Sequence, residues 1–406
     1  MFSRSAWTSL LSAATLALAA SIPVKRATVC NGHAELCNRS YGNITFVAAH
    51  DSAFFSQDPL AVARDQEVDI PTQLGLGIRM LQAQSHVNNG VLHFCHTSCS
   101  LFDGGPVVDY LKTVKTFLDA NPNEVLTLLF TNPEGQSPAT VWKPLFDEAG
   151  ECLPPPIVRH VSSPLSVPPC FERATTTLRL FQIIFTRLDP GITPLAFVPP
   201  SLPVKQSDWP TLGEMIDSGK RVVVFLDANA DGADSVDFIM PEFQMIWEPP
   251  FSSTDPTFPC KIDRIAGPLA DVDHMYMINH NLNKNLLSLG STDVLVSDPV
   301  DAPTTNGVES ILADANGCAP LGGNRAPNFV LLDYVNLGDP FTAAAQLNGL
   351  PAPAPSNAPA TVGDQVTDAA AGAVATVTGA AEDAGNAIKD GISSLGNSIK
   401  GLFGRA

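Results

Sequence analysis

The sequence predicts an α/β fold built on parallel strands, specifically a distorted TIM-type (β/α)8 barrel. Short apolar, β-branched runs alternate with longer helical or loop stretches between residues 44 and 335, which is how parallel strands and their crossover connections follow one another. Two runs, 222–226 and 330–332, are apolar at every position, as expected of strands buried on both faces. About eight strands in roughly 300 residues favour a barrel over an open sheet.

Nine runs are predicted strands, and one longer stretch is a predicted helix. Apolar residues at positions 107, 108, 111, 114, 117 and 118 recur at helical spacing, so this stretch should pack one face on the sheet. The predicted strands span residues 44–49, 78–83, 91–95, 125–130, 195–198, 221–226, 275–278, 294–296 and 329–332.

Residues 1–26 are predicted to be a secretory signal peptide with a possible propeptide. After Arg4, residues 10–20 form an uncharged apolar run that ends in small residues, which is typical of an export signal. The run is too short to span a bilayer, which takes about 20 apolar residues. Lys25 and Arg26 are either a dibasic processing site or a stray basic pair. We therefore expect a secreted, extracellular protein.

The charge of the chain argues against two kinds of partner. Its 23 Lys plus Arg stand against 41 Asp plus Glu, a formal net charge of -18. A nucleic acid requires a dense cationic face that this composition hardly supplies. Docking to an anionic membrane by bulk charge is disfavoured for the same reason.

Eight cysteines fit an oxidising compartment. The sequence has no C-x-x-C pair or Cys/His cluster of metal-ligand spacing, so a zinc site is not predicted. Asn38 and Asn43 each begin a glycosylation acceptor tripeptide, usable if the chain enters the secretory lumen. The spacing suggests three local disulfides, Cys30 with Cys37, Cys95 with Cys99, and Cys260 with Cys318.

Residues 151–191 differ in composition from their surroundings. They contain seven prolines, four arginines and no lysine within a strongly acidic protein. Residues 150–152 can be encoded as GGT-GAG-TGC, which contains a GTGAGT splice donor, and residues 190–191 can contain a CAG acceptor. The segment is therefore either a translated intron or a genuine surface insertion.

Residues 27–350 are predicted to form the barrel domain, and residues 351–406 a linker and tail. The tail begins with alternating Pro and Ala and continues in Ala, Gly, Val and Thr, which cannot bury enough apolar area to fold alone. Apolar residues between 388 and 402 have helical spacing, typical of a weak amphipathic helix on a membrane or partner. Glycines interrupt that pattern, so a disordered tail is favoured.

Two histidines directly follow predicted strands, and such residues carry chemistry in barrels. His50 comes after the first strand and His96 after the third. Strand-end histidines are often structural, but in a β/α barrel the carboxyl ends of the strands form the rim where reacting groups converge. One imidazole can take a proton from an attacking hydroxyl while the other protonates a departing oxygen. Asp51 is suited to hold one imidazole in its tautomer, and His86 is a further candidate ligand-facing group.

Around these histidines the sequence resembles the X-domain of phosphatidylinositol-specific phospholipase C, in particular the secreted phospholipase-C-like phosphodiesterases of fungi. The likeness covers roughly residues 28 to 345, apart from 151–191. It is carried by AAHDSA at 48–53, LGIRMLQAQ at 76–84, LHFCH at 92–96, NEVLTL at 123–128, DWPTL at 208–212, SGKRV at 218–222, NHNL at 279–282 and PNFVLLD at 327–333.

The resemblance implies a distorted β/α barrel that cleaves a phosphodiester by internal attack of an inositol hydroxyl, giving a cyclic phosphate and a lipid alcohol. By position, His50 matches the family's general base and His96 its general acid. Asp51 matches the residue that supports the second histidine in the metal-free enzymes. Asp333, after the last predicted strand, is the candidate partner of His50.

The second strand departs from the family pattern. Active relatives carry Asp-x-Arg or acidic calcium ligands there, whereas this chain has Gln82 and Gln84. A neutral amide can hydrogen-bond a phosphoryl oxygen, so both are candidate substrate-binding residues, but an amide lacks the charge-assisted contact of arginine. Amides supply no charge to calcium. No metal or other cofactor is therefore predicted.

Two functions of different classes follow from these residues. The leading hypothesis is a secreted, metal-independent phosphodiesterase that acts on a phosphoinositide-like or other phosphodiester through two histidines, with possible peripheral membrane or cell-wall contact. The alternative is a non-catalytic barrel that binds a sugar phosphate or glycolipid. The retained histidines favour the enzyme, and Gln82 and Gln84 favour the alternative. Hydrolysis of glycerophosphodiesters would require metal-binding carboxylates that the motifs do not offer.

Overall fold

The computed structural model describes residues 26–150, 191–289 and 292–351. The predicted signal peptide, all but the last residue of the atypical segment, and all but the first residue of the tail lie outside this part of the chain. Within it, no helix is both long and apolar enough to cross a membrane.

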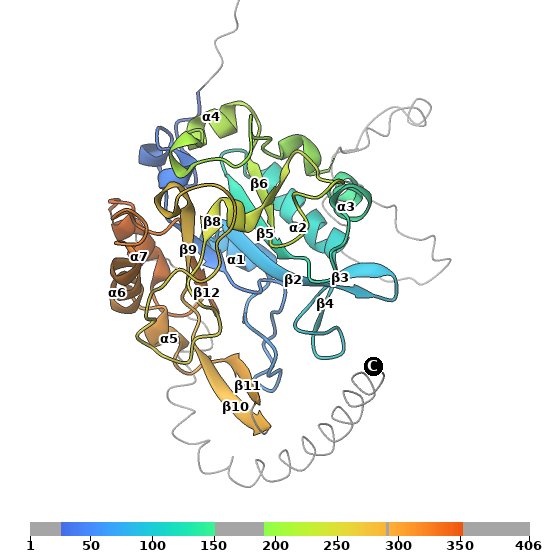
Figure 1. Ribbon diagram of the computed structural model, residues 1–406, viewed down its shortest axis with the longest axis vertical. Coiled ribbons are helices and arrows are strands. Elements are labelled where there is room, and N and C mark those ends of the chain that lie inside the picture. The colour runs from blue at the N-terminus through green and yellow to red at the C-terminus, as the bar shows by residue number, and fades with distance from the viewer. Residues whose placement is uncertain (1–25, 151–190, 290–291, 352–406) are drawn as a thin grey trace, which may run out of the picture.

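Eight parallel strands form the central sheet (Figure 1). Their order across the sheet is β7-β6-β5-β2-β1-β12-β9-β8. The first of these strands along the chain, β1, therefore pairs with the last, β12. In the described residues no ladder joins β7 to β8, which leaves a curled sheet open at one seam, the predicted distorted barrel. The strands are β1 (Phe46–Ala49), β2 (Met80–Asn88), β5 (Leu126–Thr131), β6 (Val222–Leu226), β7 (Ile239–Pro241), β8 (Ile246–Trp247), β9 (Met275–Asn279) and β12 (Phe329–Leu332).

Two antiparallel pieces lie outside the barrel, one continuing its sheet and one forming a separate hairpin. Strand β2 continues past the rim and pairs with β3 (Val91–Cys95), which in turn pairs with β4 (Asp103–Pro106). Asn89 and Gly90 both have positive φ, as a tight two-residue hairpin turn requires. After β9, the hairpin of β10 (Asn283–Leu289) and β11 (Thr292–Ser297) projects away from the sheet (Figure 1).

The helices cover the outer face of the sheet, and α1, α4 and α7 begin at side-chain caps. The Asp69 side chain accepts from the N–H of Thr72 at the start of α1, and Thr211 forms a capping box with Glu214 at α4. The α-helices are α1 (Ile70–Leu76), α2 (Val107–Ala120), α3 (Lys143–Glu148), α4 (Leu212–Asp217), α5 (Ala302–Thr305), α6 (Val308–Cys318) and α7 (Pro340–Leu347), and single turns of other helix types occupy Ala34–Leu36, Tyr41–Asn43, Pro138–Trp142, Thr193–Leu195, Gln206–Asp208, Glu242–Gln244 and Asp271–Asp273.

The core has two parts because strand side chains alternate between faces. One cluster fills the barrel and contains Phe46, Ala48, Met80 and Leu331. The other lies between sheet and helices. Two residues beyond Ala48, Met80 and Leu331 along this inner row are positions 50, 82 and 333, so the alternation directs these side chains toward the barrel mouth.

Most predicted strands are found, and each of these begins within about two residues of its expected first residue. The strand predicted at 195–198 is wrong, because the chain forms a short helical turn at Thr193–Leu195 and only Ala196 bridges to Val222. The run 294–296 is a strand, but it belongs to the projecting hairpin. The very short strands β7 and β8 were not predicted from the sequence. The three predicted disulfides, Cys30–Cys37, Cys95–Cys99 and Cys260–Cys318, are confirmed.

Candidate active site

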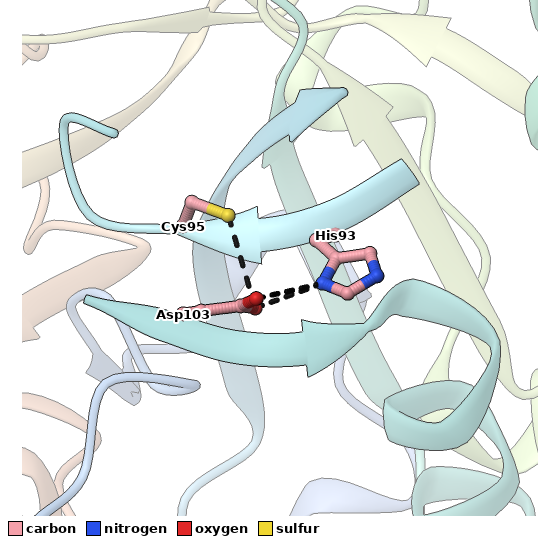
Figure 2. Close-up of side chains that lie close together, drawn as sticks. All are labelled: His93, Cys95 and Asp103. Atoms are coloured by element: carbon pink, nitrogen blue, oxygen red, sulfur yellow. Dashed lines mark hydrogen bonds and ion pairs between the residues drawn. The ribbon is translucent and has the colours of Figure 1, made fainter. Parts of the chain in front are cut away.

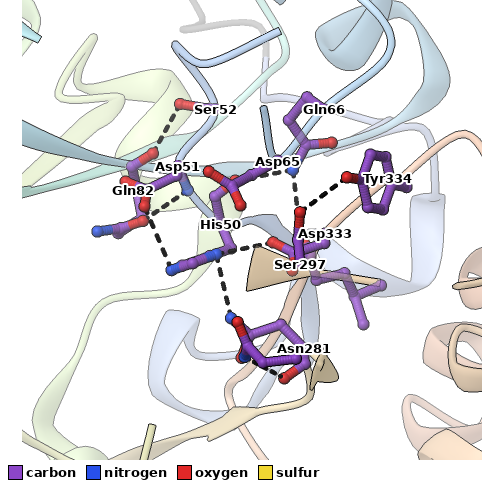
Figure 3. Close-up of polar contacts among 12 residues, drawn as sticks. His50, Asp51, Ser52, Asp65, Gln66, Gln82, Asn281, Ser297, Asp333 and Tyr334 are labelled. Carbon is purple, nitrogen blue, oxygen red and sulfur yellow. Dashed lines mark hydrogen bonds and ion pairs between the residues drawn. The ribbon is translucent and has the colours of Figure 1, made fainter. Parts of the chain in front are cut away.

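His50 lies at the barrel mouth, directly after β1. Its Nδ1 is 2.7 Å from Oδ1 of Asp333, which follows β12. The ladder between β1 and β12 places Ala49 opposite Leu332, so the next residues of the two strands come side by side. The amide of Asn281 also lies 3.1 Å from Nδ1, as Figure 3 shows. The side chain of His50 is 21% exposed.

His96 reaches the same mouth from the end of β3. Its Nδ1 lies 2.9 Å from the carbonyl oxygen of Ala63, and its ring stacks on Phe54 with 5.2 Å between centroids. The Cys95–Cys99 disulfide closes the loop that carries it. The side chain is 19% exposed, so both imidazoles are accessible to a ligand.

Asp51 lies between the two imidazoles. Its Oδ2 is 3.5 Å from Nε2 of His50 and 3.7 Å from Nε2 of His96, while its side chain is fully buried. Each Nδ1 faces an acceptor, which places the Nδ1 proton there and leaves each Nε2 to gain or lose a proton. The two Nε2 atoms therefore face the same carboxylate oxygen.

The two glutamines of β2 form hydrogen bonds to the protein around Asp51. Gln82 accepts from the N–H of Asp51 through Oε1 at 2.7 Å. Gln84 donates from Nε2 to Oδ2 of Asp51 at 2.8 Å and accepts from the N–H of Thr97 at 3.1 Å. Gln84 thus links Asp51 to the loop of His96, and contact of either amide with a substrate stays a prediction.

His86 lies farther along β2, on the part that extends beyond the barrel rim. Its Nδ1 is 2.7 Å from Oε1 of Glu134. His86 lies opposite His93 in the β2–β3 ladder. Nδ1 of His93 contacts a carboxylate oxygen of Asp103 in the same way. The predicted contact of His86 with a ligand stays a prediction.

Sequence reasoning missed three residues of the site. Asp65 is 2% exposed and lies 3.5 Å through Oδ2 from Nδ1 of His96. Gln66 donates to the carbonyl oxygens of His50 and Leu332. Asn281 follows β9 much as His50 follows β1, a signal that strand-end reasoning could have used. Asp65 and Gln66 lie in the long loop after β1, where no strand marks their position.

Buried carboxyl groups dominate the electrostatics of the site. Burial alone would lower the pKa of His50, but the charges of Asp51 and Asp333 outweigh it and raise the pKa to about 10. Burial raises the pKa of Asp333, against the opposing effect of His50. Burial also raises the pKa of Asp65 well above its usual value, and the charges of Asp333 and Asp51 add to this.

Two overlapping groups of side chains offer atoms that could bind a metal ion within 4.8 Å of one another, namely His50 with Asp65 and Asp333, and Asp51 with Asp65 and His96. A third group, His93, Cys95 and Asp103, has similar spacing (Figure 2). The sulfur of Cys95 is bonded to Cys99, so it cannot serve as the thiolate that a metal prefers.

A second polar cluster lies on the inner row past β6, β7 and β8. Arg264 forms an ion pair with the buried Glu248, which also accepts from Asn279. Burial raises the pKa of Glu242 well above its usual value, and the charge of Glu248 adds to this. Asp227, with a pKa also raised by burial, completes a set of donors and acceptors suited to hydroxyl groups.

Comparison with known proteins identifies relatives over most of the chain. The family model PI-PLC X 1 matches residues 36–150 and 174–348. PI-PLC X domain-containing protein 1 of Arthroderma benhamiae is 37% identical over 346 residues, covering 85% of this chain and 97% of that protein. An uncharacterized secreted protein of the same organism is 39% identical over 331 residues, covering 79% of this chain and 64% of its own length.

Among solved structures, a double mutant of the phosphatidylinositol-specific phospholipase C from Staphylococcus aureus is similar. It shares 12% sequence identity with a TM-score of 0.43, and the match covers 77% of this chain and 94% of that one.

Proposed function

The chain belongs to the PI-PLC X family, and from this premise we propose that it cleaves a phosphodiester, with His50 as general base and His96 as general acid. The observation that carries the proposal is the position of Asp51, whose Oδ2 lies within 3.7 Å of Nε2 of both histidines. A phosphorus atom placed before this carboxylate is flanked by a proton acceptor and a proton donor.

The proposed reaction is an in-line displacement at phosphorus. Nε2 of His50 takes the proton from a hydroxyl of the substrate while that oxygen bonds to phosphorus. The opposite P–O bond breaks, and Nε2 of His96 gives its proton to the departing oxygen. The products are a cyclic phosphate and an alcohol. Asp333 orients the ring of His50 and stabilises the imidazolium that forms. Histidine side chains carry out both proton transfers, so we propose a metal-independent enzyme.

A phosphoinositide-like head group fits the polar cluster of Asp227, Glu242, Glu248 and Arg264. Buried carboxyls paired with a guanidinium offer both acceptors and donors to a polyol. An apolar rim around the mouth supports a lipid as the rest of the substrate, because most large apolar side chains exposed in the described residues lie in loops that follow strand ends or in the β10–β11 hairpin after β9. These are Phe55, Leu60, Val62, Leu101, Phe251, Leu286, Val294 and Val300.

Secretion belongs to the same proposal. The amino-terminal apolar run, three disulfides and a relative whose name describes it as secreted support an extracellular location, with contact to a membrane or cell-wall surface through the apolar rim.

The alternative is a non-catalytic barrel that binds a sugar phosphate or glycolipid. It is favoured by one observation: in the described residues no Lys or Arg forms an ion pair with Asp51, Asp65 or Asp333. Within the described part of the chain, these carboxyl groups thus pair with imidazoles alone, and charge stabilisation of a transition state is weaker than with an arginine.

Turnover of defined phosphodiesters separates the two functions. The purified full chain and a His50→Ala, His96→Ala double variant are incubated with phosphatidylinositol and a panel of other phosphodiesters, with and without EDTA. His33→Ala serves as the control, because His33 precedes β1 at the opposite end of the barrel. We expect turnover by the unaltered chain and the control only. Absence of turnover by every protein, together with retained binding of inositol phosphate, would establish the alternative.

A further inference from the structure

Asp65 is held in place by its backbone. Its N–H donates to the carbonyl oxygen of Phe54 at 2.9 Å, and its own carbonyl accepts from Tyr334 at 2.8 Å. Tyr334 directly follows Asp333 after the last barrel strand. The residue therefore joins the loop after β1 to the end of β12, and its side chain points into the site (Figure 3).

The Asp65 carboxyl lies beside Nδ1 of His96, whereas Asp51 lies beside Nε2 of both histidines. Its Oδ2 is 3.5 Å from Nδ1 of His96, and one of its oxygens lies within 4.8 Å of a nitrogen of His50 and an oxygen of Asp333. Nδ1 of His96 already donates to Ala63, so Asp65 is a second polar neighbour of the same nitrogen. Asp51 separates the reactive Nε2 atoms, whereas Asp65 adjoins the side that fixes the ring.

The charges around Asp65 do not favour a third carboxylate. Its Oδ2 is buried and has no hydrogen-bond partner, a position in which an ionised oxygen is costly. The nearby cations are two imidazoles, which already neighbour two other carboxyl groups. Arg64 on the same loop pairs with Glu67 instead. The charged or titratable groups packed around Asp65 are His50 and Asp51 after β1, His96 after β3, and Asp333 and Tyr334 after β12.

We propose that Asp65 is a positioning residue for the two imidazoles and that it acts as a neutral carboxylic acid. A neutral group keeps polar contact with Nδ1 of His96 without adding a third negative charge to a site that must bind a phosphate anion. Ionisation of Asp65 then sets an upper pH limit, because the added charge repels the substrate and holds His50, the proposed base, protonated. This role rests on the proposed function, whereas the charge state of Asp65 does not.

Asparagine is the uncharged isostere of the proposed state. Asp65→Asn should keep kcat near neutral pH within about threefold, and it should remove the alkaline rise in KM that we expect of the unaltered chain. Asp65→Ala leaves His96 without this neighbour and should lower kcat at least tenfold at all pH values. Rescue by asparagine but not alanine, with a changed pH profile, is not expected of a residue that only fills space.

Stability against pH tests the charge state even if the chain proves to be no enzyme. A carboxyl whose pKa is raised on folding binds more protons in the native state, so its contribution to stability falls as pH rises above about 4. Urea unfolding should show Asp65→Asn gaining stability over the unaltered chain from pH 4 to 8, with no difference near pH 3. Asp301→Asn, an exposed aspartate at the start of α5, is the control and should show no such trend.

Two results would overturn the proposal. Parallel stability curves for the unaltered chain and Asp65→Asn would mean that Asp65 is ionised in the native state. A rise in Tm with added calcium or manganese, reversed by EDTA and absent in Asp65→Asn, would mean that a cation and not a proton balances the third carboxyl group. If no phosphodiester is turned over while the stability curves diverge as expected, the proposed function fails and the charge state of Asp65 stands.

Discussion

Asp333 and His50 join the last strand of the barrel to the first through a contact of 2.7 Å between Oδ1 and Nδ1. The two residues are 283 positions apart in the chain, and only closure of the sheet between β1 and β12 brings them together. Because Asp333 is buried, its charge acts on the imidazole with little screening by water.

Replacing Asp333 should therefore change how activity depends on pH. A general base must be neutral, so kcat/KM of the unaltered chain should rise with pH toward the His50 pKa of about 10, up to the pH at which ionisation of Asp65 raises KM. Asp333→Asn removes a charge that raises this pKa, so the rise should move to lower pH. The maximum rate should fall about a hundredfold or more, because the amide favours the wrong tautomer. Profiles of kcat/KM from pH 5 to 10 measure both effects. A rise at the same pH in the unaltered chain and in Asp333→Asn would mean that Asp333 does not set the pKa of the general base.

Gln84 offers a second test, since its amide connects Asp51 to the loop of His96. Gln84→Ala should lower kcat about ten- to a hundredfold, because Asp51 loses a donor and the Thr97 N–H an acceptor. KM should change little if the amide serves only the protein. A rise in KM with kcat retained would instead support the predicted contact with substrate. His86→Ala, farther along the same strand, reports on the outer part of the site.

The sequence allowed residues to be placed wherever a strand fixes them. His50, Asp51 and Asp333 adjoin apolar runs, so their position at the mouth follows from their place at the carboxyl ends of strands. His96 follows β3, which lies outside the barrel path, yet its loop folds back to the mouth. Asp65 was missed because its place depends on how a loop of nearly 20 residues (50–69) packs, and local pattern carries no such information.

The contacts of Gln82 and Gln84 could not be derived for a related reason. Their strand and face were predicted, but a side chain on the correct face still has several possible partners. The structure gives their amide oxygens to the N–H groups of Asp51 and Thr97, both at positions with positive φ. Such strained backbone at a strand end is typical of functional sites, and it is visible only once the chain has folded.

Opening the Cys95–Cys99 disulfide should affect activity more than stability. The bridge closes a short loop beside His96, so Cys95→Ser with Cys99→Ser should cost only about 2 kcal/mol of unfolding free energy. Loss of the loop geometry should still lower kcat at least tenfold. Cys260→Ser with Cys318→Ser is the matched control, because that bridge does not close the loop of His96 and joins residues 58 positions apart. Its removal should cost about 4 kcal/mol of unfolding free energy with kcat retained. The opposite pattern would contradict a role for the Cys95 loop in placing His96.

The apolar rim should bind lipid surfaces. Leu60 and Val300 are 81% and 77% exposed, and burial of both in a membrane should strengthen binding about tenfold or more. Leu60→Ser with Val300→Ser should therefore reduce co-sedimentation with phosphatidylcholine vesicles that contain phosphatidylinositol. Val29→Ser with Val198→Ser, also exposed but outside the rim, should leave binding unchanged. Equal binding by all three proteins would show that the rim makes no contact with lipid.

Gly191 occupies the position of the left-handed glycine that commonly follows the C-cap of a helix, here at the end of α3. Its φ is +68°, in the left-handed region that glycine favours. The N–H of Ile192 donates to the carbonyl oxygen of Phe146 at 2.9 Å. In a Schellman motif, this bond joins the second residue beyond the C-cap to the third residue from the helix end. Since Ala149 is the C-cap, Gly191 and Ile192 stand where residues 150 and 151 of an uninterrupted chain would stand.

Excision of residues 151–191 should therefore leave the barrel intact. The shortened chain reads Ala149-Gly150-Ile192, so one glycine still completes the cap, and the six cysteines of the three disulfides remain. We expect its Tm to match or exceed that of the full chain, with the same turnover. Excision of 150–191, which removes the glycine as well, should cost about 1 kcal/mol because the cap loses its left-handed residue. An unfolded product of the first excision, or a dominant transcript that contains the whole segment, would establish a genuine insertion. Equal stability of the two shortened chains would instead show that the cap does not hold the junction.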